Sequence, residues 1–70
     1  MHFKIELSTG TVLTSRNYDD SNPSEDRFVQ EVMRMVMEGN EGTLRFRLKS
    51  GGMVAMNYKN ATHVVVYGLK

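Results

Sequence analysis

One stretch with helical periodicity, residues 22–39, constrains the fold of this chain more than any other feature. Asn22 can accept hydrogen bonds from the first free N–H groups of a helix, and Pro23 suits the first helical position because it has no N–H to satisfy. Glu25 follows Asn22 at the spacing of a capping box. Gly39 favours the left-handed conformation that ends many helices. We therefore predict one helix here, with segments of strand character on both sides.

The predicted helix is amphipathic. At about 100° per residue, one side of it collects the apolar residues Phe28, Val29, Val32, Met33 and Val36. Two pairs of opposite charge, Arg27–Glu31 and Arg34–Glu38, are spaced four residues apart on the other side and are expected to form ion pairs. The apolar side should face a sheet, and the charged side should face solvent.

Alternation of apolar and polar residues predicts five strands around this helix. We expect strands at residues 2–7, 11–15, 43–49, 53–58 and 62–67. The order β-β-α-β-β-β with short connections predicts an α+β fold, in which an antiparallel five-stranded sheet packs on one helix. The alternative is a small SH3-like barrel with an inserted helix. The length of the chain predicts a single domain, 1–70.

Strand pairing is predicted for the hairpin after the helix and left open for the first hairpin. A three-residue loop would place apolar residues opposite one another, namely Leu48 with Val54, Phe46 with Met56 and Leu44 with Tyr58. In the first hairpin either Val12 or Leu13 can face the core, and a shift of one residue would exchange the faces. Residues 62–67 are β-branched on both faces, so we expect Val65 and Tyr67 on an uncovered sheet face or against a second copy of the chain.

Charge is unevenly distributed along a chain whose net charge is only +1. Residues 17–41 carry seven acidic residues against two arginines, whereas residues 42–70 carry five basic residues and no acidic one. The outward residues of the later strands are expected to form a basic sheet face made of Arg45, Arg47, Lys49, Asn57, Lys59, His63 and Tyr67. Basic and aromatic residues on one face are typical of nucleic-acid binding. The alternative is a solvated strand whose charges discourage aggregation.

Residues needed for most catalytic and metal sites are missing or scattered. The chain has no cysteine and only two histidines, which excludes thiolate chemistry, disulfides and cysteine-ligated zinc. Asp19, Asp20 and the acidic residues after them do not have the spacing of a calcium loop. No glycine-rich phosphate loop precedes the helix. We therefore expect no catalytic residue, no metal and no cofactor, and we predict that the protein is not an enzyme.

Three functions remain open. The first is a small non-catalytic protein-binding module, a regulator or inhibitor of a larger protein of the phage or mobile-element type. It would dock through Met35, Met37, Val65 and Tyr67, although the two methionines could instead cover the rim of the core. The second is a nucleic-acid-binding protein that uses the basic sheet face. The third is a structural subunit that adds a strand to a larger assembly.

Size and hydropathy add two further expectations. A chain of 70 residues without disulfides has a small core, and self-association is a common way to stabilise such a domain, so we expect a homodimer. The sequence shows no signal-peptide pattern and no apolar run long enough to cross a membrane. We therefore expect a cytoplasmic protein that does not contact a membrane.

Overall fold

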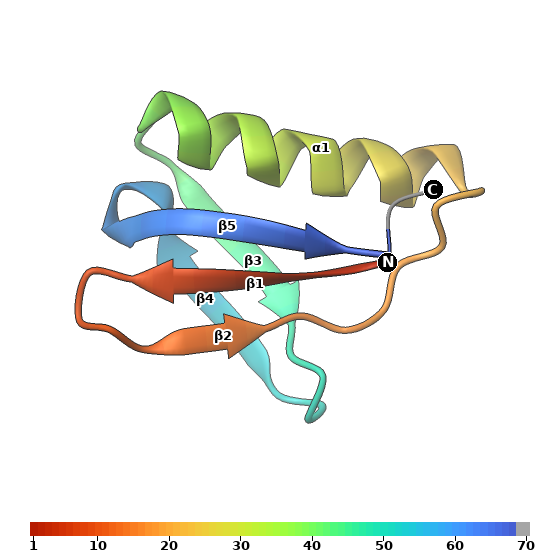
Figure 1. The fold of residues 1–70 in the computed structure, drawn as a ribbon, viewed down its shortest axis with the longest axis horizontal. Helices are drawn as coiled ribbons and strands as arrows, with labels where there is room; N and C mark the ends of the chain where they lie inside the picture. The colour runs from red at the N-terminus through yellow and green to blue at the C-terminus, as the bar shows by residue number, and fades with distance from the viewer. Residues whose placement is uncertain (69–70) are drawn as a thin grey trace.

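The chain folds in the predicted order of two strands, one helix and three strands, all strand pairs being antiparallel (Figure 1). The computed structural model describes residues 1–68. Its elements are β1 (His2–Leu7), β2 (Val12–Thr14), α1 (Pro23–Glu38), β3 (Thr43–Arg47), β4 (Met53–Asn57), the 3-10 helix η1 (Tyr58–Asn60) and β5 (Ala61–Tyr67). The predicted α+β class is confirmed. Lys70, one of the basic residues counted above, lies outside the described residues.

The strands form two sheets, so the prediction of a single five-stranded sheet is wrong. One sheet has the order β2-β1-β5, and the other is the β3-β4 hairpin. The sheets meet at one corner, where Ser15 and Leu48 form an isolated bridge and the Arg16 N–H donates to the Arg47 carbonyl at 2.9 Å. In Figure 1 the hairpin lies behind the first sheet and crosses it. Because β2 is only three residues long, it cannot continue as a ladder along β3.

The β3-β4 register differs from the predicted one by two residues. Phe46 pairs with Val54 rather than with Met56. The reason is the position of the three-residue loop: the Leu48 N–H donates to the Gly52 carbonyl at 2.7 Å, so the loop consists of residues 49–51 rather than 50–52. A shift of two residues keeps every side chain on its predicted face.

The first hairpin resolves the choice that the sequence left open. Ile5 pairs with Leu13, which places Leu13 on the same side of the sheet as the fully buried Ile5. Leu13 is half-buried, whereas Val12 is 54% exposed on the outer side.

Both ends of α1 follow the predicted local signals. The Asn22 side chain accepts hydrogen bonds from the N–H groups of Ser24 at 3.0 Å and Glu25 at 3.4 Å. Gly39 ends the helix with a φ of 66°, a left-handed conformation that glycine adopts without steric cost. On the polar side Arg34 pairs with Glu38 at 3.0 Å, as predicted.

Two predicted side-chain contacts around α1 are replaced by others. Glu25 does not reach back to the Asn22 N–H, because that N–H donates to the Asp19 carbonyl at 3.1 Å. The Glu25 carboxylate instead accepts from the Asp19 N–H at 3.3 Å and from Arg16 at 3.1 Å. Glu31 hydrogen-bonds to Arg34 rather than to Arg27.

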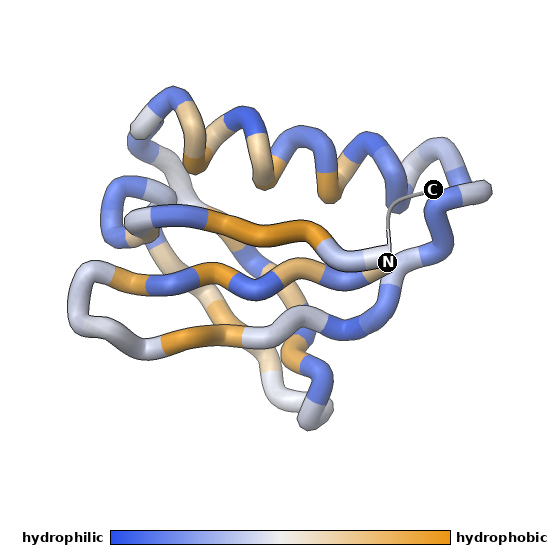
Figure 2. Tube along the Cα trace, viewed as in Figure 1, coloured by the Kyte–Doolittle hydropathy of each residue, from blue (hydrophilic) through white to orange (hydrophobic). Residues whose placement is uncertain are grey.

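The hydrophobic core lies between the first sheet, the hairpin and α1, which runs alongside β5 (Figure 1). Figure 2 shows the apolar residues of α1 on the side that faces the strands, and apolar and polar residues alternating along β1. The buried hydrophobic residues are Phe3, Ile5, Tyr18, Val29, Val32, Val36, Leu44, Phe46 and Tyr58. Burial of Leu44 and Phe46, with Arg45 exposed between them, confirms the predicted facing of the third strand.

Candidate interaction surfaces

The outward side chains of β1, β2 and β5 form one continuous surface, which we call the outer sheet face. Its residues alternate with the buried ones and are His2, Lys4, Glu6, Val12, Thr14, His63, Val65 and Tyr67. Three of its large apolar or aromatic residues are well exposed: Val12 (54%), Val65 (42%) and Tyr67 (43%). Val65 and Tyr67 are neighbours on β5, whereas Val12 lies on β2, across Lys4 and Glu6 of β1.

Contacts across the strands hold the outer sheet face in a defined arrangement. The His2 and Tyr67 rings stack with their centroids 5.1 Å apart. The Lys4 ammonium lies 5.5 Å from the centre of the Tyr67 ring. His63 Nδ1 lies 3.2 Å from a carboxylate oxygen of Glu6. The Tyr67 ring is therefore supported before any partner arrives, which reduces the entropy that binding would cost.

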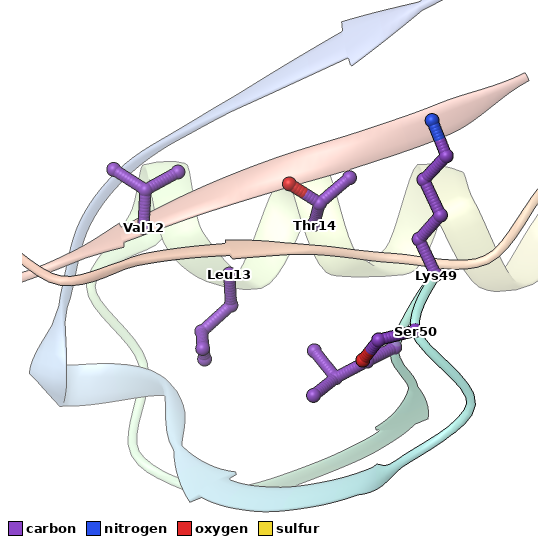
Figure 3. Close-up of a pocket in the computed structure, with 6 residues that line it drawn as sticks. Val12, Leu13, Thr14, Lys49 and Ser50 are labelled. Atoms are coloured by element: carbon purple, nitrogen blue, oxygen red, sulfur yellow. The ribbon is translucent and has the colours of Figure 1, made fainter.

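A shallow groove adjoins the outer sheet face between β2 and the loop after β3 (Figure 3). Its volume is ≈ 460 Å³, and it is lined by Val12, Leu13, Thr14, Leu48, Lys49 and Ser50. In Figure 3 Leu13 points into the space between β2 and the hairpin, while Thr14 and Lys49 point to the opposite side of β2. The groove thus offers an apolar wall next to a lysine, and it joins the outer sheet face through Val12.

The seven residues predicted to form a basic sheet face are divided between two sheets. Arg45 and Arg47 are exposed on β3, and Lys49 is exposed in the loop that follows. His63 and Tyr67 lie on β5, in the other sheet, and belong to the outer sheet face. The prediction placed them beside the arginines because it assumed a single sheet.

The remaining two members of that set have structural partners. The Asn57 side chain accepts from the Lys59 N–H at 3.1 Å and from the Gly42 N–H at 3.4 Å, so it caps η1 and ties down the start of β3. The Lys59 ammonium lies 3.9 Å from the Glu41 carboxylate. The basic surface of the hairpin is therefore smaller than predicted and consists of Arg45, Arg47 and Lys49.

The predicted protein-binding residues are also divided. Met35 is half-buried against the core, and its sulfur lies 3.5 Å from the Asn40 side-chain nitrogen, which agrees with the alternative that it covers the rim of the core. Met37 is 81% exposed on α1, away from the sheet. Val65 and Tyr67 lie together on the outer sheet face.

Most of the outer sheet face was not predicted from the sequence. The residues that share this face with Val65 and Tyr67 come from the polar side of residues 2–7 and from Val12. The signal was present in the alternation of residues 2–7, but only the pairing of β1 between β2 and β5 shows that these side chains share a surface with Val65.

No protein-family model, curated protein or solved structure matches the chain. Within residues 1–68, no group of three His, Cys, Asp or Glu side chains is placed to hold a metal ion. In that same part of the chain, α1 is too short and too polar to cross a membrane.

Proposed function

We propose that this chain is a small non-catalytic protein-binding module that regulates or inhibits a larger protein, and that the outer sheet face is its docking surface. The observation that carries the proposal is the exposure of Val12, Val65 and Tyr67 on one face, with Val65 and Tyr67 adjacent on β5. These side chains contribute little to the core, because the opposite side of the same strands supplies it. Desolvating them against a partner would gain hydrophobic free energy.

The surroundings of these residues suit specific recognition. Tyrosine is enriched among the residues that dominate binding energy, and Tyr67 is held by His2 and Lys4. Lys4 and Glu6 project from the central strand between the apolar side chains. Charges in such positions fix the orientation of a partner and exclude wrong ones. The adjacent groove could accept one apolar side chain of the partner.

Site-specific photo-cross-linking in cells that produce the chain tests this proposal. A photoreactive phenylalanine analogue at position 67 should give a discrete adduct with one partner protein, and Val65→Glu should abolish it. The analogue at position 37, which is exposed on α1, is the matched control and should not give that adduct. The same adduct from both positions, or an adduct that survives Val65→Glu, would contradict the proposal.

Nucleic-acid binding is the second candidate, and one observation favours it. β3 pairs with β4 on one side, and its other side meets the first sheet near its end, at the Ser15–Leu48 bridge. Protection of this side of β3 against aggregation is therefore the alternative to a binding role for Arg45 and Arg47. Together with Lys49 they form an exposed cationic group, in a segment from residue 42 onward that has no acidic side chain. Phosphate groups are natural ligands for such a group.

Binding of single- and double-stranded DNA and RNA at low and moderate salt tests the second candidate. Arg45→Glu/Arg47→Glu should remove any salt-sensitive binding. Lys4→Glu/Arg27→Glu changes the net charge equally at positions away from the hairpin and should retain most of it. Absence of salt-sensitive binding by the unmodified chain at low salt would exclude this candidate.

We also infer that the five strands follow the path of a small SH3-like barrel with an inserted helix, the alternative fold predicted above. Support comes from the neighbour relations: β5, β1 and β2 pair in that order, Ser15 and Leu48 link β2 to β3, and β3 pairs with β4. The 3-10 helix η1 then leads from β4 into β5. On this view α1 covers the side of the barrel that the strands leave open.

A further inference from the structure

β4 is an edge strand whose outer side is left open. Among the elements of residues 1–68, β3 is the one that packs extensively along β4. The corresponding side of β5 is accompanied by α1, as Figure 1 shows. The end of β2 meets β3 at the Ser15–Leu48 bridge. The outward hydrogen-bonding groups of β4 are therefore within reach of another strand.

Two hydrogen bonds at the ends of the hairpin show which peptide groups of β4 point away from β3. The Leu48 N–H donates to the Gly52 carbonyl at 2.7 Å, and the Tyr58 N–H donates to the Gly42 carbonyl at 2.9 Å. Bonded and non-bonded pairs alternate along an antiparallel ladder. Counting from either end, the residues whose N–H and C=O groups point away from β3 are Met53, Ala55 and Asn57.

This edge carries none of the usual protection against pairing. Natural edge strands are often shielded by a charged residue, a proline or a bulge. The five residues of β4 are Met-Val-Ala-Met-Asn, and they pair with β3 without a register shift. The charged side chains opposite β4, Arg45 and Arg47, lie on β3, one strand away from the edge.

We propose that the open edge of β4 pairs with β4 of a second copy of the chain, antiparallel and about a two-fold axis at Ala55. The two hairpins then form one four-stranded sheet. Three outward N–H groups and three outward carbonyls from each copy gain partners. This interface uses a different surface from the outer sheet face and does not depend on the proposed function.

The side chains of β4 are self-complementary in this register. Val54 and Met56 are half-buried on the core side of β4, one residue to either side of Ala55. The two-fold axis places Val54 of each copy opposite Met56 of the other, which covers apolar surface that the isolated chain leaves partly exposed. On the outer side Met53, 65% exposed, meets Asn57, and Ala55 meets its own counterpart.

The arginines of β3 do not oppose this pairing. In the four-stranded sheet the two β3 strands are three strand spacings apart, which is about 14 Å. Exposed charges separated by more than about 8 Å are largely screened at physiological ionic strength. The small Ala55 at the axis also leaves room for the two outer surfaces to approach.

Sedimentation velocity over a wide range of protein concentration tests the proposal. Ala55→Pro removes an N–H that points away from β3, so the internal ladder of the hairpin keeps its hydrogen bonds. The unmodified chain should dimerise, and Ala55→Pro should weaken dimerisation at least about tenfold, because two intermolecular hydrogen bonds are lost. Ala55→Lys, which adds a charge to the edge without a backbone constraint, should have the same effect if the proline variant fails to fold. Met37→Lys is the matched control and should dimerise normally.

Amide hydrogen exchange distinguishes the other outcomes. Exchange of the Ala55 amide should slow as the concentration of the unmodified chain rises. A chain that stays monomeric at its highest soluble concentration overturns the proposal. A dimer that both Ala55 variants leave intact also overturns the proposal, because its contact would lie elsewhere. An Ala55 amide that is protected only when a different protein is added overturns it as well. None of these results affects the cross-linking expected at position 67.

Discussion

Ser15 is a buried polar residue at the corner where the two sheets meet. Its hydroxyl accepts a hydrogen bond from the Phe3 N–H at 2.9 Å and donates to the Arg16 carbonyl at 2.9 Å. Ser15→Ala should lower the free energy of unfolding by about 1–3 kcal/mol, because the Phe3 N–H is left buried without an acceptor. Urea denaturation measures this loss. Ser8→Ala, on an exposed turn, is the control and should change stability by less than about 0.5 kcal/mol. Equal effects of the two substitutions would show that the Ser15 hydroxyl is dispensable.

Deprotonation of Tyr18 should lower the free energy of unfolding at alkaline pH. Burial raises the pKa of Tyr18 above its ordinary value of 10.0, although the Arg16 guanidinium, 4.0 Å from the ring centre, acts in the opposite direction. The unfolded chain therefore loses the phenol proton at lower pH than the folded chain. The stabilisation is complete below about pH 10 and is lost as the pH rises from there through the folded pKa. Tyr18→Phe should lose less stability than the unmodified chain between about pH 9 and 11 in denaturation experiments. Identical losses would assign the effect to Tyr58, whose pKa burial also raises.

At the scale of elements, α1 depends on its first turn. Asn22 satisfies two N–H groups that have no partner within the helix. Asn22→Ala should therefore cost about 1 kcal/mol and lower the Tm by about 4–8 °C. Thermal unfolding followed by far-UV circular dichroism measures this change. Asn17→Ala, at an exposed position in the preceding loop, should leave the Tm nearly unchanged. A Tm for Asn22→Ala close to that of Asn17→Ala would mean that water replaces the cap.

The same element shows which features a sequence predicts well. The bounds of α1 were predictable because Asn22, Pro23 and Gly39 act on peptide groups within a few residues. The capping box was not, because the Glu25 carboxylate binds Arg16 and Asp19, which a loop brings back over the helix start. The hairpin faces were predictable from alternation, whereas the β3-β4 register depended on the conformation of the loop.

At the scale of the whole molecule, the candidate surfaces depended on a feature that alternation does not encode. Period-two patterning indicates which side of a strand faces the core, but not which strand lies beside it. Arg45 and Tyr67 both point outward as predicted, yet they lie on different sheets. The division arises where the short β2 meets the hairpin through one bridge. Val65 and Tyr67 were identified from their own strand, while the rest of the outer sheet face required the strand order.

The aromatic cluster around Phe3 joins the layers of the molecule into one cooperative unit. The centroid of the Phe3 ring lies 5.9 Å from that of Tyr18 in the loop before α1. It lies 6.4 Å from the ring centroid of Phe28 in α1 and 5.0 Å from that of Phe46 in β3. Phe3→Ala should cost about 3–5 kcal/mol. A chain of this length has a total stability of roughly 4–10 kcal/mol, so this variant should be largely or marginally unfolded.

A conservative substitution at position 3 tests the role of this cluster in cooperativity while the chain remains folded. Phe3→Leu should cost less than Phe3→Ala, because leucine refills most of the space that alanine leaves empty. Its unfolding, followed by far-UV circular dichroism for α1 and by the fluorescence of Tyr18, Tyr58 and Tyr67, should remain a single transition with coincident midpoints. Separate midpoints for the two signals would mean that the helix and the strands are held together by something other than this cluster. Coincident midpoints at a lower urea concentration would instead show that one side chain of the first strand couples the helix, the loop before it and the hairpin.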